Sequence, residues 1–151
     1  KMASAYSNLK KETIEIEQLL SKAMELTSIK TVNFNINSAL LLSVDVVKSS
    51  IAIKNLIENA EKYSPVGSDV LITTGETSSE IIISVVDAGP GVPKNQLDKI
   101  TKAFVRIGEK KQGGFGLGLS ICRKVMVAHS GKLSIKNNKL GGSCFSLHFP
   151  K

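Results

Sequence analysis

Asn55 and Asn59 stand one helical turn apart in a segment whose hydrophobic pattern predicts a helix over residues 45–63. Asparagine is a poor residue for the interior of a helix, so two of them at this spacing favour a chemical role over an ordinary surface. Their amide oxygens suit a hard cation such as Mg²⁺, which takes few protein ligands when it is bound together with phosphates. The pair therefore indicates a site for a magnesium-bound phosphate compound.

The remaining residues of this helix divide into a polar side and an apolar side. At about 100° per residue, Glu58, Lys62 and Tyr63 share an arc of roughly 140° with the two asparagines, where Lys62 can meet phosphate charge. The apolar side, which can pack on a sheet, carries Ile53, Leu56, Ile57 and Ala60. The alternative is a solvated face on which Glu58 and Lys62 form an ion pair that contributes little to stability.

Asp87 ends an apolar, strand-like segment and is followed closely by Gly89 and Gly91. Glycine lets the backbone approach a ligand closely. A carboxylate at the end of a strand can accept a hydrogen bond from an exocyclic amine, which adenine carries where guanine has a carbonyl. A tight turn with a capping aspartate would explain this segment alone equally well.

A second glycine-rich segment, residues 113–121, continues directly into a helical pattern. Free backbone amides and the positive end of a helix dipole make such a junction a cradle for phosphates. A dinucleotide-binding fold would need its glycines after the first strand of a parallel unit, whereas these come late in the chain. The sequence also lacks the P-loop pattern Gly-x-x-x-x-Gly-Lys-Ser/Thr, so neither of these two phosphate-binding classes fits.

Strands and helices must bring these segments together. The hydrophobic periodicity predicts strands at residues 12–16, 31–36, 40–44, 69–74, 80–86, 132–136 and 143–149 and helices at 17–26, 45–63, 94–103 and 117–128. We expect 31–36 and 40–44 to form a hairpin-like pair, and 69–74 and 80–86 to be antiparallel neighbours. This pattern favours an α/β two-layer sandwich whose mostly antiparallel sheet carries helices on one face.

The 151 residues, 42% of them hydrophobic, suit one domain over residues 12–151, preceded by a linker or helix tail at 1–11. The net charge of +7 suits an anionic partner such as a nucleotide. The lysines are not interleaved with aromatic residues, which argues against nucleic acid. Cys122 and Cys144 lack the spacing of a zinc site. Neither a signal peptide nor a membrane-spanning run of apolar residues is expected.

Taken in order, three segments resemble the N box and two glycine boxes of sensor histidine kinases: NLIENAEKYS at 55–64, DAGPG at 87–91 and GFGLGL at 114–119. Those kinases share a class of ATPases with gyrase B, the mismatch-repair protein MutL and certain heat-shock chaperones. The similarity covers nearly the whole chain from Glu12 onward. It implies the Bergerat-type ATP-binding fold of this class, with ATP and Mg²⁺ as ligands.

The resemblance also implies individual roles. Asn59 would hold Mg²⁺ with Asn55 beside it, Lys62 would contact phosphate, and Glu58 would occupy the position of a proposed general base. The base of the nucleotide would lie against Tyr63. Its amine would be bound by Asp87, and the pocket around it would be shaped by Gly89 and Gly91.

The phosphates would be wrapped by the second glycine box, beneath a lid over roughly residues 106–113. The residues implied there are Gly114, Gly116, Leu117, Gly118 and Leu119. Phe104 and Arg106 match the family's phenylalanine-rich motif. The same motif is altered at Thr101, where an aromatic residue is usual, and at 102–103, where an acidic residue and proline are usual.

Neither histidine of the chain fits the family's phosphoacceptor. His129 ends the predicted helix 117–128, and His148 alternates with core residues on the last strand. The acceptor would thus lie on a separate dimerisation domain, homodimeric in the full protein, which would pass the phosphate to a response regulator. The chain would be the cytoplasmic part of an inner-membrane sensor. The alternatives are a catalytically weak nucleotide-binding or interaction module, and a gyrase-like or chaperone-like ATPase.

Overall fold

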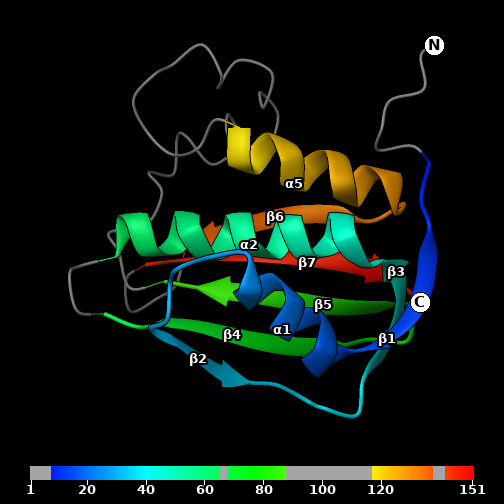
Figure 1. Ribbon diagram of the computed structural model, residues 1–151, viewed down its shortest axis with the longest axis horizontal. Helices are drawn as coiled ribbons and strands as arrows, with labels where there is room; N and C mark the ends of the chain where they lie inside the picture. The colour runs from blue at the N-terminus through cyan, green and yellow to red at the C-terminus, as the bar shows by residue number, and fades with distance from the viewer. Residues whose placement is uncertain (1–7, 65–67, 88–116, 138–141) are drawn as a thin grey trace.

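Figure 1 shows the computed structural model of the chain, which describes residues 8–64, 68–87, 117–137 and 142–151. One layer is a five-stranded sheet with the strand order β2-β4-β5-β7-β6, and helices α1, α2 and α5 cover one of its faces. The elements are β1 (Lys11–Glu15), α1 (Ile16–Glu25), β2 (Val32–Asn35), β3 (Leu41–Asp45), α2 (Val46–Tyr63), β4 (Val70–Glu76), β5 (Glu80–Val86), α5 (Leu117–Ala128), β6 (Lys132–Asn137) and β7 (Ser143–Pro150). The predicted sandwich is confirmed, and Lys11, which the sequence assigned to a linker, is the first residue of β1.

The sheet buries the side chains of alternate residues under the helices. β4 and β5 pair antiparallel, as predicted, and β5 and β6 both pair antiparallel with β7. Ile83 faces Leu147, and Val85 faces Phe145, in the register of β5 with β7. All four side chains are buried. Because side chains of a strand alternate between faces, the other face of these strands carries the more polar set.

The predicted pairing of residues 31–36 with 40–44 is wrong. β2 pairs in parallel with β4, whereas β3 pairs antiparallel with β1 in a separate two-stranded sheet. Between them the chain is held to both sheets, since the backbone N–H of Asn37 donates to Oγ1 of Thr74 and the carbonyl of Leu40 accepts from the N–H of Ile16. Alternation of apolar residues predicts which side chains are buried, but it does not specify which strand is the partner.

Helix α2 begins as the sequence predicts. Asp45 is its N-cap, and the carboxylate Oδ1 accepts a hydrogen bond of 3.0 Å from the backbone N–H of Lys48. The predicted apolar side packs inward: Ile53, Leu56, Ile57 and Ala60 are each 0% exposed. The polar side of α2 is thereby turned away from the sheet and toward α5.

Helices α2 and α5 run antiparallel along a shared seam (Figure 1). A Cβ placed on Gly118 would lie 3.7 Å from the Cβ of Asn55. One turn further along α5, Sγ of Cys122 donates to the carbonyl of Ala52 at 3.2 Å. At the far end, the imidazole of His129 meets the start of α2. The N-terminal end of α5 therefore lies beside the middle of α2.

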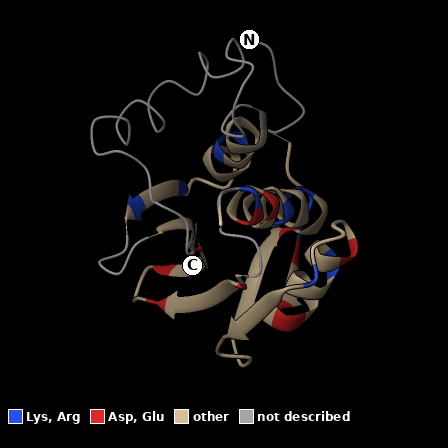
Figure 2. Cartoon of the chain, turned by 90° about the vertical axis from the view of Figure 1, so that its left-hand side faces the viewer, with Lys and Arg blue, Asp and Glu red and all other residues tan. Residues whose placement is uncertain are grey.

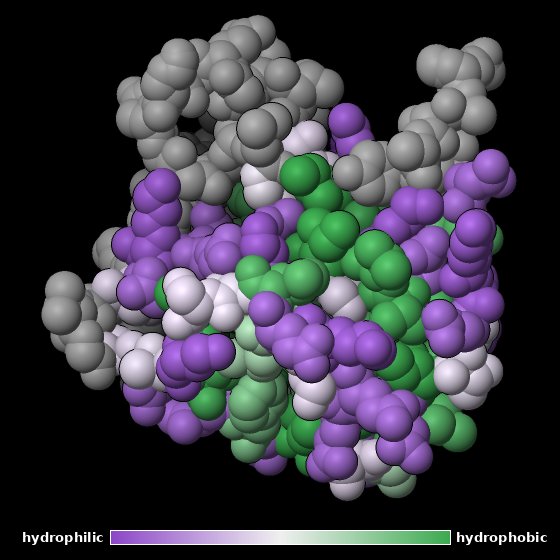
Figure 3. All heavy atoms as spheres, in the orientation of Figure 1, coloured by the Kyte–Doolittle hydropathy of each residue, from purple (hydrophilic) through white to green (hydrophobic). Residues whose placement is uncertain are grey.

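The outer side of the helical layer combines basic and apolar residues. Figure 2 marks positions of lysine or arginine on α2, on α5 and on the edge strand β6. Figure 3 shows hydrophobic residues at the surface of this layer, and Val47 of α2 and Val127 of α5 are 69% and 60% exposed. Within the described ranges, no helix is both long and apolar enough to cross a membrane.

Candidate functional site

The described parts of the three predicted motifs lie at one side of the molecule. Figure 1 shows the C-terminal half of α2, the carboxyl end of β5 and the N-terminal end of α5 all directed toward the left of the view. Each comes from a different part of the chain. The fold therefore places the two asparagines, Asp87 and Gly118 in the same region of the sandwich.

The two asparagines of α2 carry polar atoms that protein contacts leave unsatisfied. Asn59 is 6% exposed, and neither its amide oxygen nor its amide nitrogen has a hydrogen-bond partner among the described residues. The same holds for Nδ2 of Asn55. A buried polar group without a partner costs about 1–3 kcal/mol. Such a cost on the covered face of a helix argues against an ordinary solvated face and points to a ligand.

Helix α5 approaches the asparagine pair at Gly118. A Cβ added there would be in ordinary van der Waals contact with the side chain of Asn55, so the first turn of α5 lies directly beside this residue. The first turn of α5 brings the positive end of its dipole toward the same place. Leu119, also predicted to bind the nucleotide, is 1% exposed and belongs to the hydrophobic core. Only its backbone is available for the predicted contact.

Lys54 is a member of this site that was not predicted from the sequence. Its Nζ lies 3.3 Å from Oε1 of Glu58 and 3.2 Å from Oδ1 of Asn55. Glu58 thus pairs with the residue one turn before it. The alternative prediction was a pair with Lys62, which lies exposed in the last turn of α2. Lys54 belongs to no recognised motif, so its contacts with both Glu58 and Asn55 are seen only in the structure.

Asp87 is held in one orientation by Ser143. The aspartate is 4% exposed. Its Oδ2 accepts a hydrogen bond of 2.7 Å from the Ser143 hydroxyl, and its Oδ1 accepts one of 3.2 Å from the Ser143 backbone N–H. The backbone N–H of Asp87 donates in turn to the Ser143 carbonyl at 2.9 Å. Ser143 was not predicted to belong to the site, although it directly follows Gly141 and Gly142.

Several predicted site residues cannot be compared with the structure. Gly89, Gly91, Phe104, Arg106, Gly114 and Gly116 lie outside the described residues, as do the side chains of Tyr63 and Leu117. The altered motif at residues 101–103, the predicted lid and the predicted helix at 94–103 also lie outside them. Their assignments stay predictions.

The donor atoms at this site fit Mg²⁺ bound together with phosphate. Within the described ranges, no three His, Cys, Asp or Glu side chains gather in a way that could hold a metal ion. Asn59 instead offers a buried amide oxygen without a partner. A neutral oxygen ligand of this kind suits a cation that keeps most of its charge balance with phosphate oxygens. Asn55 offers a second amide one turn away.

The two histidines are both engaged by protein groups. On the outer face of the sheet, Nδ1 of His148 lies 3.1 Å from Oε1 of Glu80, and its Nε2 lies 2.8 Å from Oγ of Ser134. His129 is 3% exposed at the end of α5.

The two cysteines differ in their surroundings. Cys122 is buried, and desolvation raises the pKa of its thiol well above the usual range. Cys144 is partly buried, and its Sγ lies 3.6 Å from the hydroxyl of Ser146.

The chain is similar to known proteins over most of its length. Residues 45–151 match the family described as histidine kinase-, DNA gyrase B-, and HSP90-like ATPase. The sensor protein KdpD of Clostridium acetobutylicum is 31% identical over 153 residues, an alignment that covers 96% of this chain and 17% of KdpD. The chain therefore spans only a small part of that curated relative.

Two solved structures resemble the chain closely. The catalytic domain of histidine kinase ThkA has a TM-score of 0.78 and 25% identity, and the match covers 95% of this chain and 98% of that domain. Full-length ShkA in complex with AMPPNP has a TM-score of 0.79 and 26% identity, with coverage of 97% and 32%. The likeness to ThkA thus extends over nearly the whole of both chains.

Proposed function

The chain belongs to the family of histidine kinase-, DNA gyrase B- and HSP90-like ATPases, and from this membership we propose that it is the ATP-binding catalytic domain of a sensor histidine kinase. It would bind ATP with Mg²⁺ and donate the γ-phosphate to a histidine on a separate domain. The relatives that support this proposal are a sensor protein and the catalytic domain of a histidine kinase. The ShkA structure, which is similar over 97% of this chain, contains AMPPNP.

One observation carries the proposal. The amide of Asn59 is buried with both of its polar atoms unsatisfied, one turn along α2 from Asn55, which lies beside Gly118 of α5. A protein that uses these residues only for packing would gain by replacing such an amide with an apolar side chain. A bound metal and phosphate would instead satisfy it, and would meet the amino-terminal end of α5.

Each described residue has a distinct part in the proposed site. Asn59, with Asn55 beside it, would hold Mg²⁺, which supplies positive charge against the phosphates. Asp87, already oriented by Ser143, would accept the hydrogen bond of the adenine amine. Lys62, exposed at the end of α2, would meet phosphate charge. Positioning and charge neutralisation of this kind are the main demands of phosphoryl transfer.

Glu58 is the candidate for moving a proton. Its side chain is 40% exposed, and its carboxylate pairs with Lys54, which also binds the amide oxygen of Asn55. We assign it the task of taking the N–H proton of the acceptor imidazole as the phosphorus is attacked. Lys54 would orient the carboxylate for this step and connect its position to that of the asparagine pair.

The other parts of the reaction would come from outside this chain. A dimerisation domain would supply the phosphoacceptor histidine and the homodimer contact, and a response regulator would receive the phosphate. By similarity to a sensor protein, this domain would be cytoplasmic and joined to the membrane only through upstream segments.

Titration calorimetry of ATP with and without Mg²⁺, followed by transfer to a separately supplied acceptor domain, tests the proposal. We expect Mg²⁺-dependent binding and a phosphorylated acceptor. Asn59→Ala should lose the dependence on Mg²⁺, whereas Asn35→Ala, an exposed asparagine of β2, should keep it. ATP hydrolysis without any acceptor would favour a gyrase-like ATPase, and binding without transfer would favour a nucleotide-binding module.

A further inference from the structure

His129 lies where three elements meet, at the end of the helical layer opposite the asparagine pair. Its Nε2 accepts a hydrogen bond of 3.0 Å from the backbone N–H of Asp45, the N-cap of α2. Its Nδ1 lies 2.8 Å from the carbonyl of Val125 in the last turn of α5. The ring packs edge-on against Phe149 of β7, with ring centroids 5.5 Å apart.

These contacts fix the protonation state of the imidazole. A backbone N–H can only donate, so Nε2 must accept and carries no hydrogen. A carbonyl can only accept, so the hydrogen must be on Nδ1. His129 is therefore neutral, with the hydrogen assigned to Nδ1 by its partners. A proton added to Nε2 would place two donors face to face and break the hydrogen bond to Asp45.

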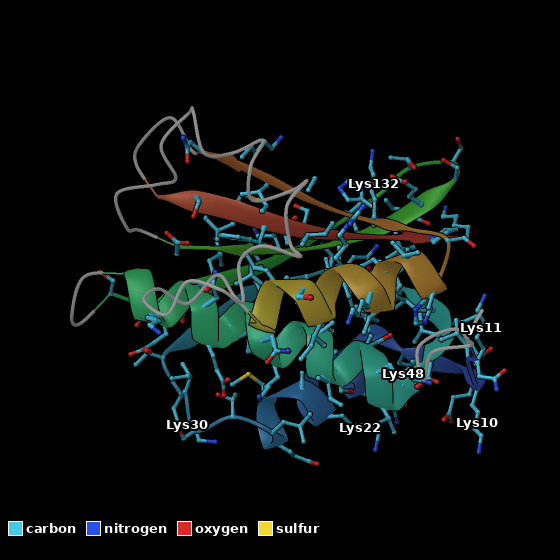
Figure 4. All side chains as sticks on the ribbon, turned by 90° about the horizontal axis from the view of Figure 1, so that it is seen from above. Lys10, Lys11, Lys22, Lys30, Lys48 and Lys132 are labelled. Atoms are coloured by element: carbon cyan, nitrogen blue, oxygen red, sulfur yellow. The ribbon has the colours of Figure 1, made fainter. Side chains whose placement is uncertain are left out.

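Asp45 extends this connection to the first strand. Its Oδ2 accepts a hydrogen bond of 2.9 Å from the backbone N–H of Lys10, and its Oδ1 accepts one from the N–H of Lys48. The chain of hydrogen bonds thus runs from the residue before β1, through the N-cap of α2, to the last turn of α5. Figure 4 shows Lys10, Lys11 and Lys48 toward this same end of the molecule.

Contacts between the two helices extend from His129 to the proposed nucleotide site. Asp45, the N-cap of α2, meets His129, whereas Ala52 and Asn55 of α2 meet Cys122 and Gly118. The contacts advance in opposite directions along the two helices, as in an antiparallel pair. Because α5 is a continuous helix of 12 residues, a displacement at its His129 end also moves the backbone that approaches Asn55.

We propose that His129 is a positioning residue for the nucleotide site, a neutral latch that holds α5 in register with α2 and releases it on protonation. The proposal rests on the proposed function, because it concerns the site where ATP and Mg²⁺ would bind. The latch would also let the segment before β1, through Lys10 and Asp45, influence the register of α5. His129 touches no reacting group and acts only through α5.

The charges around the imidazole agree with a neutral ring. Burial is the main cause that lowers the pKa of His129, and the cations Lys11 of β1 and Lys48 of α2 lower it further. The Val125 carbonyl and the Asp45 carboxylate act in the opposite direction. The neighbour from β7, Phe149, is uncharged. The latch should therefore be closed at neutral pH and open as the solution becomes acidic.

The protonation state can be measured directly on the wild-type chain. Two-dimensional NMR of the imidazole nitrogens at pH 7.5 should show His129 as the neutral form with hydrogen on Nδ1. A charged ring, or hydrogen on Nε2, at this pH would overturn the proposal. This measurement needs neither a nucleotide nor a variant, so it is independent of the proposed function.

Nucleotide affinity provides the second test. The wild type and His129→Phe, which keeps an aromatic ring but has no ring nitrogen, are titrated with Mg-ATP between pH 7.5 and 5.5. At pH 7.5 the wild type should bind about fivefold more tightly, the factor that one hydrogen bond can supply. The ratio of the two affinities should fall as the pH is lowered, because protonation of His129 removes the hydrogen bond to Asp45. Protonation of ATP affects both proteins alike, so the ratio of affinities is the readout.

Two further variants separate positioning from packing. His129→Gln keeps an acceptor for the Asp45 N–H and should restore part of the affinity without its pH dependence. His148→Gln removes the other histidine and should leave the wild-type pH profile unchanged. An affinity ratio between wild type and His129→Phe that stays constant with pH would show that His129 only packs.

Amide hydrogen exchange distinguishes failure of the latch from failure of the proposed function. At one pH, His129→Phe should exchange faster than wild type at residues 118–122, whether or not ATP binds. Wild type that binds no ATP, together with this faster exchange, would refute the nucleotide site and retain the latch. Equal exchange in the two proteins would overturn the latch even if ATP binds.

Discussion

Ser143 donates two hydrogen bonds to the carboxylate of Asp87, one from its hydroxyl and one from its backbone N–H. The two residues belong to neighbouring strands, because Asp87 follows β5 and Ser143 begins β7. The carboxylate is thus oriented by the sheet itself before any ligand arrives. An acceptor that is already oriented loses less entropy when it binds a ligand.

Removal of the orienting hydroxyl should weaken ATP binding without unfolding the domain. We expect Ser143→Ala to lower affinity by about fivefold, since one hydrogen bond contributes about 1 kcal/mol. Asp87→Asn should have a much larger effect, because its amide group presents a donor to the adenine amine. Calorimetry would measure both. Ser146→Ala, which removes a hydroxyl from the other face of β7, is the control, and an unchanged affinity in Asp87→Asn would refute the assignment of the base pocket.

Asn59 should show opposite effects on stability and on binding. Because both polar atoms of its amide are buried and unsatisfied, Asn59→Leu should leave stability without ligand unchanged or raise it by about 1 kcal/mol. The same change should abolish Mg²⁺-dependent ATP binding. Urea unfolding and calorimetry on one protein sample test the pair of effects. A large loss of stability would show that the amide is needed for packing and not for a ligand.

Asp45 should contribute to stability at neutral pH and lose that contribution in acid. Burial alone would raise the pKa of its carboxyl, but the backbone N–H groups of Lys10 and Lys48 and the Lys48 ammonium more than compensate and lower it. The native carboxylate therefore binds a proton less readily than the unfolded one, so the stabilisation is present above the unfolded pKa and falls as pH drops through the native pKa.

Two replacements of Asp45 test this pH dependence of stability. Asp45→Ala should destabilise the chain by about 1 kcal/mol at pH 7 through loss of the helix cap. Asp45→Asn keeps a capping oxygen but not the charge. Its difference from wild type in urea unfolding should shrink as pH falls toward 3. A difference that is the same at pH 7 and pH 3 would mean that the charge contributes nothing.

Gly131 should not tolerate a side chain. It follows Ser130, whose φ of 61° ends α5 in the left-handed region, and a Cβ at position 131 would collide with the backbone oxygen of His148. Gly131→Ala should therefore cost about 1–3 kcal/mol. The control is Gly75→Ala, where the nearest atom to the new Cβ is 3.9 Å away. Thermal unfolding would compare them, and similar losses in the two variants would contradict the expected collision.

Much of the fold was predictable because local patterns determine it. The apolar stripe of α2, its cap at Asp45, and the alternation in β5 and β7 each follow from spacing along a short segment. The partner of β2 was not predictable in this way. Its four residues alternate as a strand of either sheet would, and the choice of β4 depends on contacts such as Asn37 with Thr74 that are distant in sequence.

The residues of the site also divide into those that a local pattern predicts and those that depend on contacts distant in sequence. Asn55 and Asn59 could be identified because two asparagines one turn apart conflict with helix propensity. Lys54 could not, since a lysine on an exposed-looking turn is ordinary until the structure shows it between Glu58 and Asn55. Ser143 also needed the structure, because its importance depends on the pairing of β5 with β7.

The position of β7 inside the sheet has a consequence for biosynthesis. Although β7 is the last of these strands in chain order, it lies between β5 and β6, so β5 lacks one of its two neighbours and β6 lacks its partner until β7 arrives. As the polypeptide leaves the ribosome, α2 and β5 emerge long before Ser143. The carboxylate of Asp87 would thus acquire its orienting partner only late in synthesis, when Ser143 has emerged.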